Sequence, residues 1–214
     1  MKIRYLGHSS FALTSDSGAT VVTDPYDSSV GFEMPRVFAH AVTLSHHHYD
    51  HANVAAVDGN PAVFDKPENY TVGDIRIRGI RSYHDNMQGA RRGENVIFKY
   101  CADGLDICHL GDLGEDVSAE LVKAIGSVNV LLIPVGGTYT IDAEMAKKYV
   151  DAIKPNAVIP MHFKTEDLTL DISSADKFLS LFAGVTIEKG ANEISLSRGN
   201  IGGVTSKIIV MERE

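Results

Sequence analysis

Four of the nine histidines in this 214-residue chain fall within six consecutive residues, directly after an apolar segment. The stretch reads Ser45-His46-His47-His48-Tyr49-Asp50-His51. In an extended segment residues two apart share a face, which places His46, His48 and Asp50 together, and His51 joins them if a helix begins there. Imidazole and carboxylate donors suit zinc, iron or manganese without any thiolate. The stretch therefore predicts a metal site; a solvated histidine-rich loop and a tag remnant are the alternatives.

Three further candidates lie where apolar segments end. His84 follows the segment 75–83, Asp112 follows 108–111, and His162 follows 157–161. A histidine at a strand end is more often a packed or hydrogen-bonded residue, so each alone would be unremarkable. Together they add a ligand for each of two metal ions and an acidic residue able to bridge them, as in hydrolytic sites whose ions lie about 3.5–4 Å apart.

Short strands in the first half of the chain must position the early candidates. Strands are expected at 2–6, 11–14, 19–23 and 41–44, and hairpins at 70–72 with 75–82 and at 96–100 with 105–110. From Ser118 the pattern alternates between helix and strand. Ser118 and Asp142 are expected to cap helices through Ile125 and Ile153, and a third helix is expected from Ser173 or Ser174 through Phe182. Further strands are expected at 128–134, 157–161, 185–188, 193–197 and 207–211.

No Pro-rich or Ser-rich linker divides the chain, so residues 1–214 are interpreted as one domain. With 44% hydrophobic and 22% charged residues, the composition excludes collagen-like, disordered and coiled-coil classes. The net charge of −8, from 20 basic and 28 acidic residues, argues against a nucleic-acid partner. No apolar run could span a membrane and no secretory signal is evident, so a cytoplasmic protein is expected.

The two cysteines are not expected to pair. If Asp103-Gly104 is a hairpin turn, Cys101 faces Asp106 and Cys108 faces Lys99, which leaves the sulfurs diagonal. Two reduced thiols are consistent with a cytoplasmic location.

The ordered set His46-x-His48-x-Asp50-His51, His84, Asp112 and His162 resembles the metallo-β-lactamase superfamily. Four further motifs resemble its small metal-dependent hydrolase branch, which includes L-ascorbate-6-phosphate lactonase-like proteins: Gly7-His8-Ser9-Ser10-Phe11, Thr23-Asp24-Pro25, His109-Leu110-Gly111-Asp112 and Pro160-Met161-His162. The resemblance extends over nearly the whole chain. It implies an α/β (α+β) fold, a four-layer αββα sandwich with a two-metal site at one edge of its sheets.

The resemblance also implies a role for each candidate. His46, His48 and His84 would hold one divalent ion, Asp50, His51 and His162 the other, and Asp112 would bridge them. Zinc is the expected metal, with manganese or iron as alternatives. Asp24 and His8 would not bind the metal but would fix the orientation of the ligands. For His8 the alternative is a solvated loop histidine, and for Asp24 it is the acceptor of an Asp-Pro turn. His40 and His47 fit no ligand role, and His109 is expected to be packed.

Two departures from the pattern stand out. Leu113 replaces a threonine that is common after Gly111-Asp112, and residues 207–211 form an additional strand that would pair an edge strand or a neighbouring subunit.

Residues 85–95 follow His84 and resemble a stretch in one subgroup of the branch. Arg91 and Arg92 lie there between glycines, where an arginine could hold a phosphate or carboxylate; a solvated surface loop is the alternative.

The hypothesis is that a metal-bound hydroxide attacks a small-molecule lactone, ester or amide, with Asp50 as the catalytic residue that orients water or carries a proton. A phosphodiesterase acting on a small phosphodiester uses the same chemistry, and a non-catalytic metal-binding domain is the third reading. The expected partner is a small-molecule substrate, without nucleic acid or membrane, and a homo-oligomer is left open.

Overall fold

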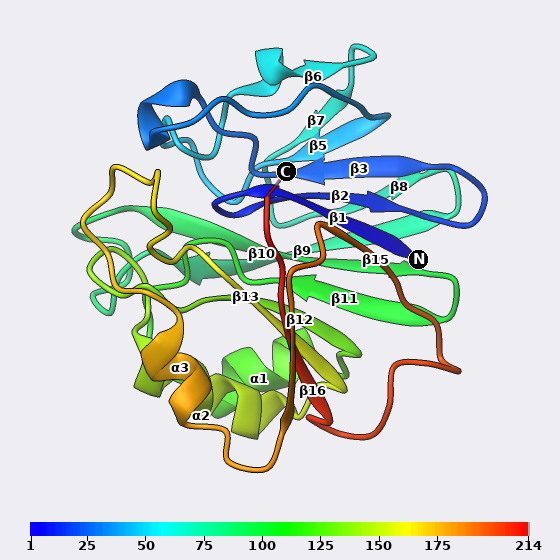
Figure 1. Ribbon diagram of the computed structural model, residues 1–214. Coiled ribbons are helices and arrows are strands. Elements are labelled where there is room, and N and C mark those ends of the chain that lie inside the picture. Colours follow the sequence, from blue (N-terminus) through cyan, green and yellow to red (C-terminus); the bar gives the residue numbers. More distant parts are fainter. Residues whose placement is uncertain (214) are drawn as a thin grey trace.

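The computed structural model describes residues 1–213, and it contains two mixed β-sheets that face each other (Figure 1). The first sheet has the strand order β15-β1-β2-β3-β5-β7 and the second β14-β16-β13-β12-β11-β10-β9-β8. The first sheet consists of β1 (Lys2–Gly7), β2 (Ser10–Thr14), β3 (Thr20–Thr23), β5 (Ala41–Thr43), β7 (Ala62–Phe64) and β15 (Glu193–Ser195).

The second sheet is larger and contains both predicted hairpins. It consists of β8 (Asn69–Val72), β9 (Ile75–Tyr83), β10 (Glu94–Ala102), β11 (Leu105–His109), β12 (Val130–Pro134), β13 (Ala157–Met161), β14 (Thr186–Lys189) and β16 (Lys207–Val210). A separate short pair joins β4 (Val37–Phe38) to β6 (Val57–Asp58).

Apolar side chains between the two sheets form the central core. Ile3 and Phe11 of the first sheet and Phe98, Ile107 and Leu132 of the second are fully buried in one cluster. Every residue of β12 and of β13 is buried, because helices cover the other face of this sheet. Both strands therefore read as continuous apolar runs in the sequence.

Three helices cover the outer face of the second sheet (Figure 1). They are α1 (Ala119–Ile125), α2 (Ala143–Ile153) and α3 (Asp176–Ser180). The predicted caps are confirmed: Ser118 Oγ accepts a hydrogen bond from Leu121 N at 3.1 Å, and Asp142 Oδ1 accepts one from Met145 N at 2.9 Å.

The third helix is shorter than expected. It begins at Asp176 without a side-chain cap, because the cap residue is Ala175, which has no polar side chain; the preceding Ser174 hydroxyl donates to the Asp176 carboxylate at 2.9 Å. At its other end Leu181 and Phe182 donate to carbonyls three residues back, and this tighter turn ends the helix at Ser180.

The outer face of the first sheet is covered by loops and two 3₁₀ turns, η1 (Ser28–Val30) and η2 (Val54–Ala56). Leu6, Val22 and Val42 pack there against Tyr26 and Val30. The metallo-β-lactamase type of fold is thus confirmed, with a loop-built layer in place of α-helices on this side of the described chain.

The β10–β11 register places Cys101 opposite Asp106 and Lys99 opposite Cys108, as predicted. Both thiols are free, and burial raises the pKa of Cys101 to about 11 and that of Cys108 to about 12. The C-terminal strand β16 lies between β13 and β14 of the same chain, which accounts for its strand character without a neighbouring subunit. Among residues 1–213, no helix combines the length and apolar character that crossing a bilayer requires.

Candidate metal centre

Six parallel-running strands end at the same edge of the two sheets, and a predicted site residue follows each of them. The pairs are β1 with His8, β3 with Asp24, β5 with the 46–51 stretch, β9 with His84, β11 with Asp112 and β13 with His162. Within each sheet, the strand pairings give the three strands one direction: β1, β3 and β5 in the first sheet, and β9, β11 and β13 in the second. The carboxyl ends of strands are where ligand sites of mixed sheets commonly form.

The backbone turns sharply at three of these strand ends. His8, Asp24 and His162 adopt φ values of 53°, 40° and 49°, in the left-handed region that non-glycine residues rarely occupy. Strain of this kind costs about 1–3 kcal/mol per residue and concentrates at functional sites. Gly111 makes a similar turn before Asp112, with a φ of 57°, and a Cβ at this position would also lie only 2.4 Å from Asn95 Oδ1.

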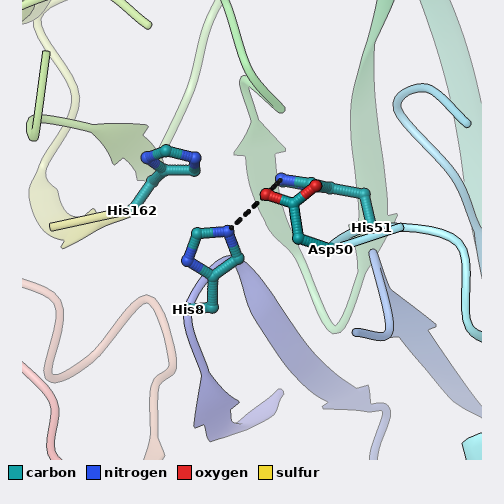
Figure 2. Close-up of side chains that lie close together, drawn as sticks. All are labelled: His8, Asp50, His51 and His162. Atoms are coloured by element: carbon teal, nitrogen blue, oxygen red, sulfur yellow. Dashed lines mark hydrogen bonds and ion pairs between the residues drawn. The ribbon is translucent and has the colours of Figure 1, made fainter. Parts of the chain in front are cut away.

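The donor atoms gather into two groups without shared members, and a third set, His46, His51 and Asp112, connects them. His46, His48 and His84 form the first, and the nearest ligand atoms of its members lie within 4.8 Å of one another. The second comprises His8, Asp50, His51 and His162 within the same limit (Figure 2). This division matches the sets implied by the sequence, with His8 added to the second group.

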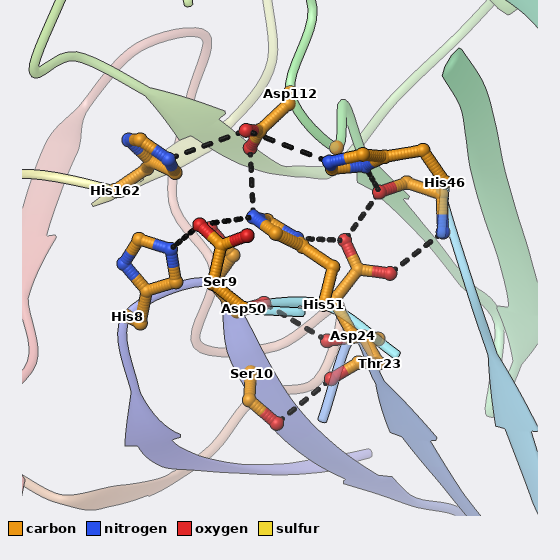
Figure 3. A network of polar contacts seen from close by, with 12 residues as sticks. His8, Ser9, Ser10, Thr23, Asp24, His46, Asp50, His51, Asp112 and His162 are labelled. Carbon is orange, nitrogen blue, oxygen red and sulfur yellow. Dashed lines mark hydrogen bonds and ion pairs between the residues drawn. The ribbon is translucent and has the colours of Figure 1, made fainter. Parts of the chain in front are cut away.

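Asp112 lies between the two groups (Figure 3). Its Oδ2 is 3.3 Å from His84 Nε2 and 3.3 Å from His162 Nε2, and its Oδ1 is 3.3 Å from His51 Nε2. One buried carboxylate thus contacts a member of the first group and two members of the second.

Several of these atoms are buried without a hydrogen bond. They include His46 Nε2, His51 Nε2, His162 Nε2 and Asp112 Oδ1. A buried polar atom without a partner costs about 1–3 kcal/mol, so a folded protein rarely keeps several together. Imidazole nitrogens and carboxylate oxygens that converge in this way fit divalent metal ions.

The protonation states of His46, His8 and Asp112 fit a metal centre. His51 differs: burial alone would lower its pKa, but the carboxylates of Asp112 and Asp24 raise it well above its ordinary value. Burial, with the nearby His51, lowers the pKa of His46 to about 3; burial, with the nearby His162, lowers that of His8 to about 4. Burial alone would raise the pKa of Asp112, but the charges of His162 and His51 bring it well below its ordinary value. Neutral imidazoles and ionised carboxylates are the forms that bind metal.

Asp24 orients two of the histidines from behind. Its Oδ2 accepts hydrogen bonds from His51 Nδ1 at 2.9 Å and from Ser45 Oγ at 2.6 Å, and its Oδ1 accepts one from Ser45 N at 2.7 Å. The Ser45 hydroxyl lies 2.9 Å from His46 Nδ1. Supporting contacts of this kind set the tautomer and direction of a ligating histidine.

His8 is buried, with 2% of its surface exposed, so the alternative of a solvated loop histidine is wrong. Its Nε2 lies 3.3 Å from Asp50 Oδ2. Burial alone would raise the pKa of Asp50, but this hydrogen bond and the charge of His51 together lower it below its ordinary value.

The 46–51 stretch differs in shape from the extended segment assumed in the sequence analysis. It is a turn closed by a hydrogen bond from His51 N to His48 O at 3.0 Å, and no α-helix begins at His51. Asp50 therefore does not share a face with His46 and His48, and it lies in the second donor group.

The remaining histidines take the places expected of them. His47 is exposed, and its Nε2 lies 3.1 Å from Asp65 Oδ2. The exposed His40 accepts a hydrogen bond from Thr20 N at 3.1 Å through Nδ1. His109 is buried and its Nε2 donates to Ser9 O at 2.8 Å.

Two supporting residues, Ser45 and Asn95, were missed in the sequence. The buried Asn95 Oδ1 accepts a hydrogen bond from Asp112 N at 2.9 Å, and its Nδ2 donates to Leu110 O at 2.9 Å. The available signal was a polar residue directly beside each apolar run. Leu113, at the position where threonine is common, is fully buried in the cluster beneath the helices.

A cavity of about 560 Å³ opens onto both donor groups. His48 and His84 of the first group, Asp50 of the second, and Asp112 all line it. Its other walls are Tyr49, Tyr139, Leu170, His47, Arg91 and Arg92. The volume is that of a typical small-molecule site.

Two facing mixed sheets with a histidine and aspartate cluster at one edge define a metal-binding protein of the metallo-β-lactamase fold. Residues 2–162 match the family model described as "Beta-lactamase superfamily domain". The chain belongs to this superfamily.

Solved and curated relatives extend the assignment. A Thermotoga maritima crystal structure, provisionally assigned as a zinc-dependent hydrolase of the metallo-β-lactamase superfamily, is 38% identical, with a TM-score of 0.82 over 100% of this chain and 99% of that one. A UPF0173 metal-dependent hydrolase of Thermoplasma acidophilum is 30% identical over 78% of this chain and 85% of its own length. One from Thermococcus onnurineus is 25% identical over 77% and 85%. The protein is a metal-dependent hydrolase of this superfamily.

Proposed function

We propose that the centre is binuclear and that the protein hydrolyses a lactone, ester or amide bond in a small molecule. The position of Asp112 between the two donor groups carries this proposal. His46, His48 and His84 would hold one ion, Asp50, His51 and His162 the other, and Asp112 would contact both. Zinc is the proposed metal because imidazoles make up most of the donor set.

When bound, such ions would supply an activated water molecule and polarise the carbonyl that it attacks. The chain's own contribution starts with Asp50, which lines the cavity and is the candidate to orient that water and accept its proton. His8 donates to Asp50 Oδ2, which keeps the carboxylate ionised and fixes its direction. Asp24 holds His51, and Asn95 holds the backbone of Asp112.

A small phosphodiester is the second candidate substrate, because two arginines line the cavity. A screen of zinc-loaded protein against a lactone, an aryl ester, an amide and bis-p-nitrophenyl phosphate separates the two. Turnover of the carbonyl substrates that is lost in Asp50→Asn is the expected result, and zinc content should fall with it because Asp50 is also a proposed ligand. Turnover of the phosphodiester alone would favour the second candidate, and no turnover with two ions bound would contradict both.

A matched pair of variants ties any activity to the donor groups. His48→Ala should lower zinc content, because it removes a member of the first group. The adjacent His47→Ala removes an exposed imidazole outside both groups and should leave zinc content unchanged. Equal zinc contents in the two variants would contradict the proposed ligand set.

A further inference from the structure

We propose that Arg91 and Arg92 form an anion-binding subsite, so that the substrate is a small molecule with a carboxylate or phosphate group away from the bond that is cleaved. The inference rests on the proposed hydrolase function and deepens it. It is carried by the loop 85–93, which links the ligand-donating end of β9 to β10.

The buried side chain of Asp85 fixes the shape of this loop. Its Oδ1 accepts hydrogen bonds from Met87 N at 2.8 Å and Gly89 N at 3.0 Å, and its Oδ2 accepts them from Arg91 N at 2.9 Å and Arg92 N at 2.8 Å. Asp85 is only 3% exposed. Since all four donors are backbone groups, the loop's shape is independent of the side chains at 91 and 92.

The Arg92 side chain forms part of the cavity wall. Its Nη2 donates to Thr138 O at 3.0 Å, and its guanidinium lies 5.6 Å from the centre of the Tyr139 ring. These contacts use one N–H donor of the guanidinium and place it near an aromatic ring, and neither contact neutralises its charge. A carbonyl and an aromatic ring thus hold a cation at the edge of the cavity.

The exposed Arg91 side chain has no hydrogen bond or ion pair to any residue that the structure describes. Arg36, Arg81 and Arg213 all pair with carboxylates, at 2.9, 2.7 and 3.0 Å respectively. The carboxylate of Asp85, in the same loop, already accepts four backbone hydrogen bonds and does not pair with either arginine side chain. Two adjacent positive charges therefore lie on the cavity without a carboxylate partner.

Their position relative to the donor groups defines the substrate class. The same cavity is lined by Arg91 and Arg92 and by Asp50, His84 and Asp112. A protein with a net charge of −8 repels anions in general, and two arginines reverse this locally. A guanidinium binds a carboxylate or phosphate by two parallel hydrogen bonds, which fixes the orientation of a ligand as well as its charge.

Calorimetric titration of the zinc-loaded protein with succinate and with glycerol phosphate tests the subsite directly. Arg91→Gln should weaken binding of at least one anion about tenfold while zinc content is unchanged. Arg81→Gln is the matched control, because it removes the same charge from the neighbouring strand at a residue outside this cavity. The anion that loses more affinity identifies the preferred group.

Equal affinities in wild type, Arg91→Gln and Arg81→Gln, or no binding by the wild type, would overturn the subsite. Kinetics with mono-4-nitrophenyl glutarate and its neutral methyl ester provide a second readout. The preference of the wild type for the anionic ester should fall about tenfold in Arg91→Gln. If neither ester is cleaved, the hydrolase proposal is contradicted for esters, whereas the calorimetry still decides the subsite.

Discussion

The two ends of the β-sandwich use polar residues in opposite ways. At the hairpin end, Ser15 Oγ and Ser17 Oγ donate to Asp74 Oδ1 at 2.6 and 2.7 Å, and Asp103 Oδ2 accepts from Asp16 N at 3.0 Å. At the other end of the same strands, several buried nitrogen and oxygen atoms have no hydrogen bond. One end is therefore complete within the protein, whereas the other is completed by a ligand.

This difference separates residues that hold the fold from residues that hold the metal. Changes at the metal centre should alter metal binding and activity far more than changes at the hairpin end. Changes at the hairpin end should alter the free energy of unfolding alone.

The largest effect is expected for Asp112→Asn, which replaces the carboxylate between the two donor groups by a neutral amide. Activity should fall by more than about a hundredfold, beyond the loss seen when a merely supporting contact is removed. Steady-state kinetics beside elemental analysis check this. Full activity in the variant would contradict the proposal that Asp112 contacts two metal ions.

Metal removal should lower the stability of the folded protein, because the donor groups exist only in the folded state. At a free metal concentration of a hundred times Kd, the stabilisation lost is about 2.7 kcal/mol. Thermal unfolding with and without a chelator measures it. Asp112→Asn should show a smaller difference between the two conditions; an identical difference would mean that the metal binds elsewhere.

Asp24→Asn tests the support behind His51 and His46. The amide has one acceptor where the carboxylate has two, so the hydrogen bonds from His51 and Ser45 cannot all be kept. Metal affinity should fall by about ten- to a hundredfold. Competition with a chromophoric chelator measures the affinity, and a change below twofold would argue that the ligands are held without Asp24.

The smallest effect is expected toward the hairpin end, for Lys99→Met. Lys99 Nζ donates to Ser127 O and lies 3.4 Å from Asp106 Oδ2. Losing these contacts should lower the free energy of unfolding by about 1 kcal/mol, measured by denaturant titration of the metal-free protein. Metal content should stay that of the wild type, and a loss of metal would show that the two ends are coupled.

The sequence predicted the features that local chemistry determines. Ser118 and Asp142 cap helices because their side chains accept backbone hydrogens three residues on. The β10–β11 register follows from the two-residue turn between those strands. The donor set was predicted because its spacing resembles the superfamily pattern, and because the 46–51 stretch, His84, Asp112 and His162 all follow predicted strands.

Features that depend on distant parts of the chain were not predictable. Placement of His8 beside Asp50 depends on β1 and β5 ending at the same edge of the first sheet, although β2 and β3 lie between them. The contact between Asn95 and Asp112 crosses two neighbouring strands of the second sheet. The turn at 46–51 is closed by a backbone hydrogen bond, which leaves no periodic pattern in the sequence.

Metal content per chain, measured by elemental analysis on untagged protein, tests the central claim most directly. A binuclear centre predicts about two zinc, iron or manganese ions per chain once the protein is saturated. Saturation at one ion would contradict the binuclear proposal, because half of the donor atoms would remain unused. No uptake at all would contradict the metal centre itself.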